Sequence, residues 1–254
     1  MVPFQTIPPS ESFGRSEFFD KLNIPHFLPQ KPGSQVEFQV IPMYFFDLDG
    51  TLLDSNGVWL DIDIAFLARY GISPVPPDYT DYVVHHTFED AAEYTRQCFG
   101  LTETPAEIIA VWRDMAREAY AHQLPLKPGT REFLTRAQAS GTGCALLTSC
   151  MPALCRSALE HHDLLPLLDG VYTTAELGLE KGDPALYTTL AQRLDLAPAD
   201  CVLFDDSPVY CRAAQQAGWR VFAVPDPVFD DRADELRALC GPEGYPFSFF
   251  GPLP

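Results

Sequence analysis

The sequence predicts an α/β fold: a parallel sheet covered by helices on both faces, with a helical block inserted after the first strand. From about residue 127 to residue 224, short apolar runs alternate with segments of helical period. Such alternation implies right-handed βαβ units and a parallel sheet. One more apolar run precedes a long helical stretch, and a chain of 254 residues can hold both a core and an insert.

The first predicted strand follows an N-terminal segment without recognisable chemistry. Residues 1–40 carry scattered Pro, Ser and Gln with little sustained period, so we predict a poorly ordered extension. The composition of the sequence then changes: residues Met43 to Phe46 are all apolar, and Asp47 follows directly. A buried parallel strand delivers polar groups to its carboxyl end in this way. The core is therefore expected to comprise residues 41–56 and 127–240.

The inserted block, residues 57–126, is predicted to form a small helical bundle. Its clearest helix begins at Thr104, where Pro105 suits the first helical position and Glu107 completes a capping box. Apolar residues then recur on one helical face. Further helices are expected over residues 58–70 and 88–98.

After the insert, helices and strands are predicted to alternate, and the chain ends in a tail. The expected helices cover 130–140, 152–162, 183–194 and 208–217, and the expected strands cover 144–148, 170–173, 201–204 and 221–224. Residues 241–254 are rich in Gly and Pro, so we predict a C-terminal tail without a helix and assign it no function.

The amino-acid composition indicates which partners the protein can bind and in which compartment it is expected. Seventeen basic against 35 acidic residues give a net charge of −18, which disfavours nucleic acid as a partner. No apolar stretch reaches the length of a membrane helix, and the first residues lack the features of a signal peptide. The seven cysteines include no C-x-x-C pair, which favours free thiols in a reducing compartment. We therefore expect a cytoplasmic protein without a membrane or nucleic-acid partner.

Polar residues gather where the predicted strands end. Ligands of parallel α/β sheets bind outside the carboxyl ends of the strands. The residues at three of these strand ends are acidic or carry a hydroxyl group, and a lysine lies in the chain between the second and the third of these ends. They are Asp47, Asp49, Thr148, Ser149, Lys181, Asp205 and Asp206. Carboxylates suit a hard cation, while hydroxyl, N–H and ammonium groups suit a phosphoryl group. Such a set can hold both together.

Asp47 and Asp49 are expected to act as a pair. Alternate residues of an extended segment face the same way, so both carboxylates reach the site while Leu48 points into the core. One can attack while the other handles the proton. A carboxylate nucleophile divides one difficult displacement into two easier ones through an aspartyl-phosphate.

Four segments resemble the ordered motifs of the haloacid dehalogenase superfamily of phosphatases. They are Asp47-Leu48-Asp49-Gly50-Thr51-Leu52-Leu53-Asp54-Ser55, then Thr148, then Lys181 in Glu180-Lys181-Gly182-Asp183-Pro184, then Phe204-Asp205-Asp206-Ser207-Pro208. The resemblance covers about residues 42–224. Within the superfamily, the chain resembles the phosphoglycolate phosphatase and beta-phosphoglucomutase-like subfamily. It implies a Rossmann-like catalytic core with an inserted α-helical cap at residues 57–126.

The resemblance also implies a role for each motif residue. Asp47 is the nucleophile and a Mg²⁺ ligand, and Asp49 is the general acid and base with its backbone carbonyl on the metal. Thr148, the backbone N–H of Ser149 and Lys181 hold the phosphoryl group. Asp206 completes the metal shell with Asp205 close behind. The chain departs from the family at Tyr210, where many relatives carry a further Asp, and at Trp59, where the mutase branch has a histidine.

The main hypothesis is a Mg²⁺-dependent phosphatase acting on a small-molecule phosphomonoester. Asn56, Trp59 and Phe88 are candidates for the substrate pocket. One alternative is a sugar phosphomutase on the same scaffold, and another is a catalytically silent binding protein. Neither the substrate nor the oligomeric state follows from the sequence.

Overall fold

A computed structural model describes residues 42–84 and 88–254. The described residues belong to one compact unit, which begins at residue 40. The extension predicted over residues 1–40 lies outside the described residues.

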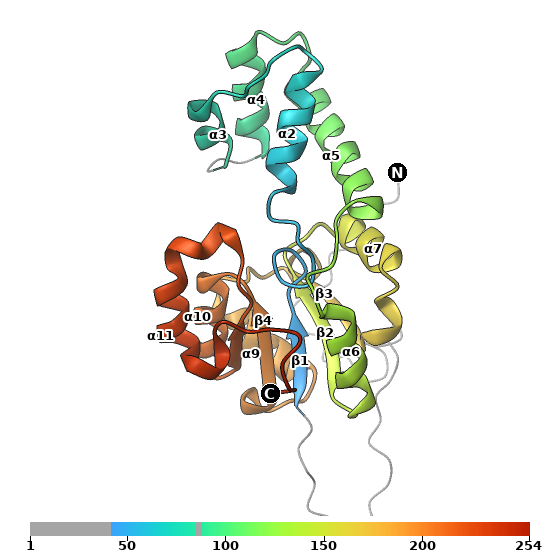
Figure 1. The fold of residues 1–254 in the computed structure, drawn as a ribbon, viewed down its shortest axis with the longest axis vertical. Coiled ribbons are helices and arrows are strands. Elements are labelled where there is room, and N and C mark those ends of the chain that lie inside the picture. Colours follow the sequence, from blue (N-terminus) through green and yellow to red (C-terminus); the bar gives the residue numbers. More distant parts are fainter. Residues whose placement is uncertain (1–41, 85–87) are drawn as a thin grey trace, which may run out of the picture. The chain divides into compact units, whose positions relative to one another are not determined.

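The sheet has five parallel strands in the order β3-β2-β1-β4-β5 (Figure 1). The strands are β1 (Met43–Phe46), β2 (Gly143–Thr148), β3 (Gly170–Thr173), β4 (Cys201–Asp205) and β5 (Arg220–Ala223). Met43 of β1 lies opposite Gly143 on one side and Cys201 on the other. The predicted α/β class with a Rossmann-like parallel sheet is confirmed.

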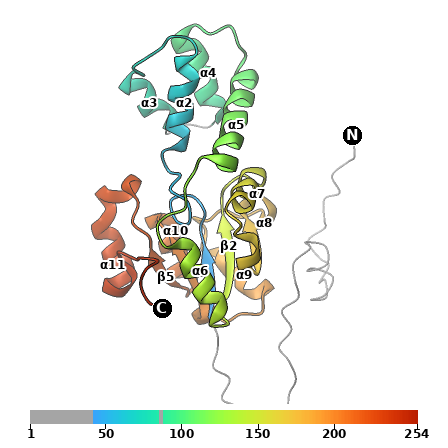
Figure 2. The same ribbon diagram turned by 45° about the vertical axis from the view of Figure 1, so that its right-hand side comes forward.

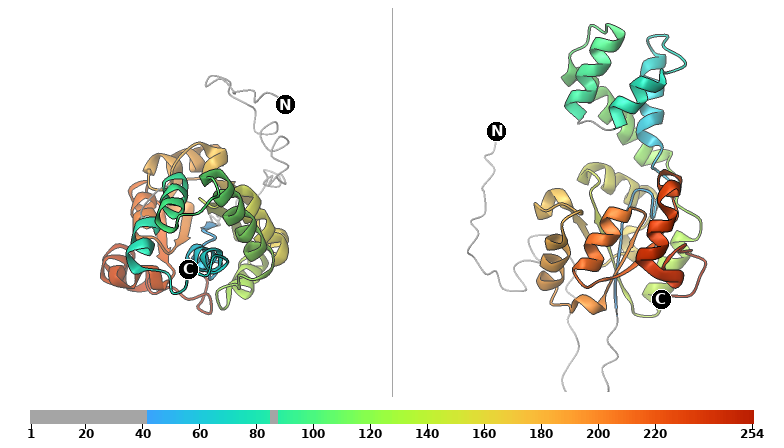
Figure 3. Two further views of the ribbon diagram at one scale, coloured as in Figure 1. Left: turned by 90° about the horizontal axis from the view of Figure 1, so that it is seen from above. Right: turned by 90° about the vertical axis from the view of Figure 1, so that its left-hand side faces the viewer.

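Two groups of helices cover the two faces of this sheet, and both can be followed by colour in Figure 3. They are α6 (Thr130–Ala139) and α7 (Pro152–His161), then α9 (Pro184–Arg193) and α10 (Pro208–Gln216). On one face, the Phe133 ring lies 6.2 Å from Tyr44 and 6.0 Å from Phe46. On the other, Phe45 lies 4.7 Å from Trp219, which contacts Tyr187 of α9. Packing on both faces holds β1, and hence the residue that follows it, in place.

The insert consists of four helices, drawn together in Figure 2. They are α2 (Val58–Ala68), α3 (Pro77–Val84), α4 (Phe88–Phe99) and α5 (Pro105–His122). The capping box predicted for α5 is present: the Glu107 N–H donates to Thr104 Oγ1 at 3.3 Å, and the Thr104 N–H donates to Glu107 Oε2 at 2.8 Å. The buried side of α5 includes Ile108 and Trp112, as its apolar period predicted.

The chain enters and leaves the insert through two paired linkers. The Asp54 N–H donates to Pro125 O at 3.0 Å, and the Lys127 N–H donates to Leu52 O at 2.9 Å. Leu53 and Leu126 form an antiparallel bridge between these two bonds. The first and last residues of the insert are therefore neighbours.

The C-terminal region departs from the prediction. A helix absent from the expected set, α11, spans Ala233–Gly244. Gly241 has non-helical φ and ψ of 71° and 177°, so a kink divides α11 into two helical pieces, and Pro242, which has no N–H to donate, stands at the start of the second. Beyond the helix, Phe247 and Phe249 are buried against Phe133 at 5.5 and 5.4 Å. The tail therefore belongs to the packed core.

The remaining short elements are helical turns between the strands. They are α8 (Thr174–Leu177) and the 3-10 segments Leu165–Leu167, Pro198–Asp200 and Pro227–Arg232. All seven cysteines are free. Among the helices of the described residues, none is long and apolar enough to cross a membrane. The cytoplasmic location stays a prediction.

Candidate active site

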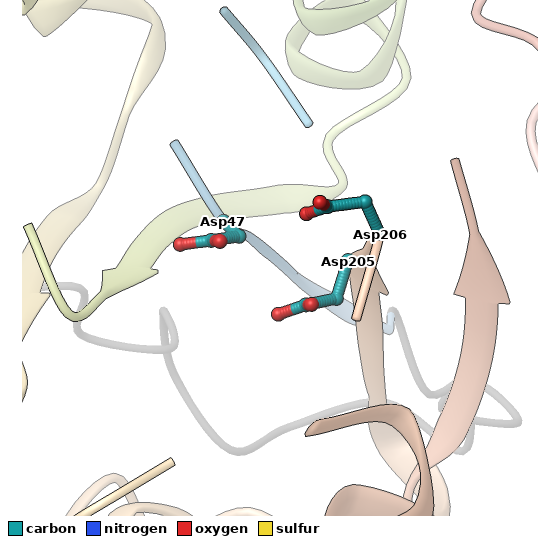
Figure 4. A group of neighbouring side chains, drawn as sticks. All are labelled: Asp47, Asp205 and Asp206. Carbon is teal, nitrogen blue, oxygen red and sulfur yellow. The ribbon is translucent and has the colours of Figure 1, made fainter. Parts of the chain in front are cut away.

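Three carboxylates meet where β1 and β4 end side by side (Figure 4). Phe46 pairs with Phe204, so the next residues, Asp47 and Asp205, are neighbours, and Asp206 follows. The Asp47 N–H extends the ladder by donating to Phe204 O at 2.9 Å. Oxygens of the three carboxylates all lie within 4.8 Å of one another, and all three residues are buried. The fold thus brings the first and the last of the four motifs together in one cluster.

Lys181 lies against this cluster from the loop between α8 and α9. Its Nζ is 3.0 Å from Asp47 Oδ1 and 2.6 Å from Asp205 Oδ2, and its side chain is 0% exposed. Burial alone would lower the pKa of Lys181, but the carboxylates of Asp205 and Asp47 raise it well above its usual value. The ammonium group therefore stays charged and orients Asp47.

Two tyrosines fix the position of Lys181. The Tyr187 hydroxyl donates to Lys181 O at 3.0 Å. The Tyr210 ring lies 4.6 Å from Lys181 Nζ, within the range of a cation–π contact. Tyr210, where the family pattern has an additional Asp, thus contacts the lysine through its ring.

One ammonium group does not balance three buried carboxylates. Burial, strengthened by neighbouring carboxylates, raises the pKa of Asp206 to about 8. Burial also raises the pKa of Asp205 to about 6, despite Lys181. This excess of negative charge among hard oxygen donors fits a divalent cation of the Mg²⁺ type. A cation there would keep both groups ionised.

The Asp206 carboxylate is oriented from the turn after β1. Thr51 Oγ1 donates to its Oδ1 at 3.1 Å, and Asn56 Nδ2 donates to its Oδ2 at 2.9 Å. Gly50, which precedes Thr51, has a φ of 73°, and a Cβ at that position would collide with the Asp206 carboxylate and with Asn56. The site therefore requires glycine at position 50. The sequence did not single out Thr51 for a role.

Asp49 points to a different set of partners. Its Oδ1 accepts hydrogen bonds from Ser55 Oγ at 2.6 Å and from the Tyr120 hydroxyl at 2.7 Å. Burial raises the pKa of Asp49, while these two donors lower it. Ser55 stands within the recognised motif, but Tyr120 is on α5 of the insert, and no local pattern connects it with Asp49.

The predicted phosphate-binding pair stands at the end of β2. The buried Thr148 hydroxyl accepts a hydrogen bond from the Cys150 N–H at 3.1 Å, so its own proton is free to donate elsewhere. Ser149 is exposed. This arrangement suits donation toward a phosphoryl group.

The three candidates for the substrate pocket lie at two places. Asn56 contacts the Asp206 carboxylate. Trp59 and Phe88 pack against each other in the insert, with ring centroids 5.0 Å apart. The roles of these residues stay predictions.

Comparison with known proteins decides the family. A family model described as "Haloacid dehalogenase-like hydrolase" matches residues 44–224, well over half of the chain. The chain belongs to this family. The matched range runs from β1 to the residue after β5 and contains every motif residue named above. The predicted membership of the haloacid dehalogenase superfamily is confirmed.

Individual relatives of this haloacid dehalogenase-like hydrolase agree with that assignment. "Protein CbbY, plasmid" of Cupriavidus necator is 28% identical, with 71% of this chain and 76% of that protein covered. A "Probable pseudouridine-5'-phosphatase" of Drosophila melanogaster is 27% identical, with 72% and 80% covered. A crystal structure of a putative beta-phosphoglucomutase from Thermotoga maritima shares the fold at a TM-score of 0.66, with 21% identity and coverage of 73% and 86%. The predicted enzyme class, a hydrolase of phosphoric monoesters, is confirmed by the phosphatases among the curated relatives.

Proposed function

We propose that this haloacid dehalogenase-like hydrolase releases phosphate from small phosphomonoesters through an aspartyl-phosphate on Asp47, with Mg²⁺ as its cofactor. The observation that supports this most directly is the fully buried Lys181 bridging Asp47 and Asp205 beside an excess of carboxylates. Asp47, Asp206 and the backbone carbonyl of Asp49 would hold the ion. Both Asp205 oxygens already have partners, Lys181 and the Ser207 N–H, so Asp205 adjoins the ion.

The residues divide the reaction into two displacements. An Asp47 oxygen attacks phosphorus, the bond from phosphorus to the leaving oxygen breaks, and Asp49 gives its proton to that oxygen. Thr148, the Ser149 N–H and Lys181 neutralise the phosphoryl oxygens. Water then attacks phosphorus, Asp49 takes its proton, and Asp47 is released with inorganic phosphate. Mg²⁺, when bound, reduces the repulsion between the carboxylate and the phosphate dianion.

The cap gives no support to the mutase alternative. A mutase must bind a second phosphate through cations of the cap. Each of the insert's four arginines, all among the described residues, is either paired with a carboxylate or exposed. Arg96 pairs with Glu93 and Arg117 pairs with Asp114, each at 2.6 Å, and Arg69 and Arg113 are exposed. Trp59 stands where the mutase branch has a histidine, and its side chain has no titrating group. Water is therefore the expected acceptor.

The test follows turnover of para-nitrophenyl phosphate by the full chain. Phosphate release is expected with MgCl₂, to stop with EDTA and to fall sharply in Asp206→Asn, because one ligand carboxylate is lost. In ¹⁸O-enriched water the heavy oxygen should enter inorganic phosphate. Transfer of phosphate between positions of a sugar, with little inorganic phosphate, would support the mutase instead. Absence of turnover with folded protein and bound Mg²⁺ would support the silent binding protein.

Tyr120→Phe is expected to lower kcat by about 10- to 100-fold without unfolding the protein. The change removes one of two hydrogen bonds that orient Asp49, a loss of about 1.5–3 kcal/mol for a donor to a charged group. Because that donor lowers the pKa of Asp49, the pKa should rise, and the limb on which kcat/KM falls as Asp49 loses its proton should move to higher pH.

The matched control for this change is Tyr70→Phe. It removes an exposed hydroxyl of the same insert, bonded to Glu103 at 2.6 Å, and should leave the pH profile unchanged. Identical pH profiles for Tyr120→Phe and the unmodified protein would show that Tyr120 does not position Asp49.

A further inference from the structure

The insert contains a small cavity with aromatic walls. Its volume is about 100 Å³, and its lining in the described part of the chain includes Trp59, Phe88 and Trp112. Phe88 stands perpendicular to both neighbours, at 87° to Trp59 with 5.0 Å between centroids and at 87° to Trp112 with 5.6 Å. An apolar cavity of about 150 Å³ holds benzene, so this one suits a somewhat smaller group.

A buried carboxylate stands in the same lining. Asp63 of α2 is 6% exposed. Its Oδ1 accepts a hydrogen bond from the Tyr79 hydroxyl at 2.8 Å, and that hydroxyl contacts Thr95 Oγ1 at 2.8 Å. Its Oδ2 is buried without a hydrogen-bond partner. The structural network therefore accounts for one oxygen and leaves the other for a ligand, since such an oxygen is costly to leave unpaired.

The charge of this lining selects among ligands. Across the described residues that line the cavity, Asp63 is the one charged group, and neither Lys nor Arg is present. Burial raises the pKa of Asp63 to about 6, so its carboxyl group is ionised at pH 7.5. A phosphate or carboxylate would be repelled, whereas a hydroxyl would leave the charge uncompensated. An ammonium group compensates the charge and is attracted by the ring faces.

The cavity and the carboxylate cluster are close along the chain. Asn56, whose amide contacts Asp206, precedes Trp59 by three residues. Three residues span at most about 10 Å between Cα atoms, so Trp59 in the wall of the cavity lies near the turn that carries Asn56. Trp112, another residue of the lining, has a buried indole N–H without a hydrogen-bond partner among the described residues.

We propose that this cavity binds an organic ammonium group and that the substrate class is the phosphate monoester of an amino alcohol. The inference rests on the proposed phosphatase activity. Water splits the bond between phosphorus and the alcohol oxygen, and the products are inorganic phosphate and an ammonium-bearing alcohol. Asp63 compensates the ammonium charge while the three rings surround its carbon atoms.

The first test measures binding without catalysis. Tetramethylammonium chloride, at ionic strength balanced with NaCl, should change tryptophan fluorescence with saturation, because Trp59 and Trp112 line the cavity. Asp63→Asn keeps an oxygen for the Tyr79 hydroxyl but removes the charge, and should weaken this binding at least about tenfold. Asp61→Asn, an exposed change on the same helix, should not. Equal responses to tetramethylammonium and neutral neopentyl alcohol would overturn the proposal.

The second test measures selectivity. The kcat/KM for choline phosphate should exceed that for 3,3-dimethylbutyl phosphate, its neutral counterpart of the same shape, at least about tenfold. Asp63→Asn should abolish that ratio, whereas Asp61→Asn should keep both the ratio and para-nitrophenyl phosphate turnover. If para-nitrophenyl phosphate is hydrolysed but the neutral ester reacts equally well, this inference fails alone. If no phosphate ester is hydrolysed, the proposed function fails, and tetramethylammonium binding still decides the ammonium site.

Discussion

Asp47→Asn is expected to reduce turnover by about 10⁴- to 10⁶-fold, the scale on which enzymes lose activity when their nucleophile is removed. The amide has nearly the same shape as the carboxylate but cannot attack phosphorus, and it contributes no charge to the cation site. The fold should persist, because the Asp47 N–H keeps its bond to Phe204 O and β1 stays packed on both faces. Phosphate release and far-ultraviolet circular dichroism measure the two expectations.

A control for Asp47→Asn is Asp234→Asn. The Asp234 side chain is 100% exposed on α11 and pairs with Arg237 at 2.8 Å, so the same chemical change there should leave turnover unchanged. Mass spectrometry after a rapid quench should find the aspartyl-phosphate in the unmodified protein and none in Asp47→Asn. Activity of Asp47→Asn within tenfold of the unmodified protein would remove Asp47 from the role of nucleophile.

Lys181→Met is expected to lower both activity and stability. The buried Nζ bridges Asp47 and Asp205, and its loss leaves two buried carboxylates uncompensated. Breaking a buried ion pair from one side costs about 3–5 kcal/mol of unfolding free energy. Activity should fall by about 10²- to 10³-fold, because a donor to the phosphoryl oxygens is also removed. Urea denaturation and phosphate release measure the two losses.

The double variant Lys181→Met with Asp205→Asn separates the two effects. Removing the charge of Asp205 relieves one uncompensated carboxylate, so part of the stability should return. Activity should not return, because the phosphoryl group still lacks its ammonium donor. A single Lys181→Met variant as stable as the unmodified protein would show that this ion pair does not hold the site together.

The sequence predicted the site at the strand ends because parallel topology is a strong constraint. Once β1 and β4 are recognised as neighbouring parallel strands, Asp47 and Asp205 must end at the same edge of the sheet. The capping box of α5 was equally predictable, because all of its groups lie within four residues. Features defined by short spacing or by sheet topology are therefore accessible from one sequence.

Contacts between distant segments that the sheet topology does not determine were not predicted. Tyr120 reaches Asp49 across 71 positions, and only the packing of α5 brings them together. Asp63 looks like a solvated helix residue until Tyr79 and Thr95 from two other helices surround it. In the tail, the abundance of Gly and Pro suggested an absence of helix, but the structure has a kink at Gly241 followed by a second helical piece that ends at Gly244.

The paired linkers at Asp54 and Pro125 make the cap a module. Because the Asp54 N–H is bonded to Pro125 O, the gap left by removing the insert could be spanned by a tight turn without displacing β1 or α6. Neighbouring ends are also what lets one domain be inserted into another without disturbing the host. A single evolutionary event could therefore exchange this whole bundle for another. The carboxylate cluster stays with the sheet in such an exchange, whereas the aromatic cavity and Tyr120, the partner of Asp49, would be replaced together.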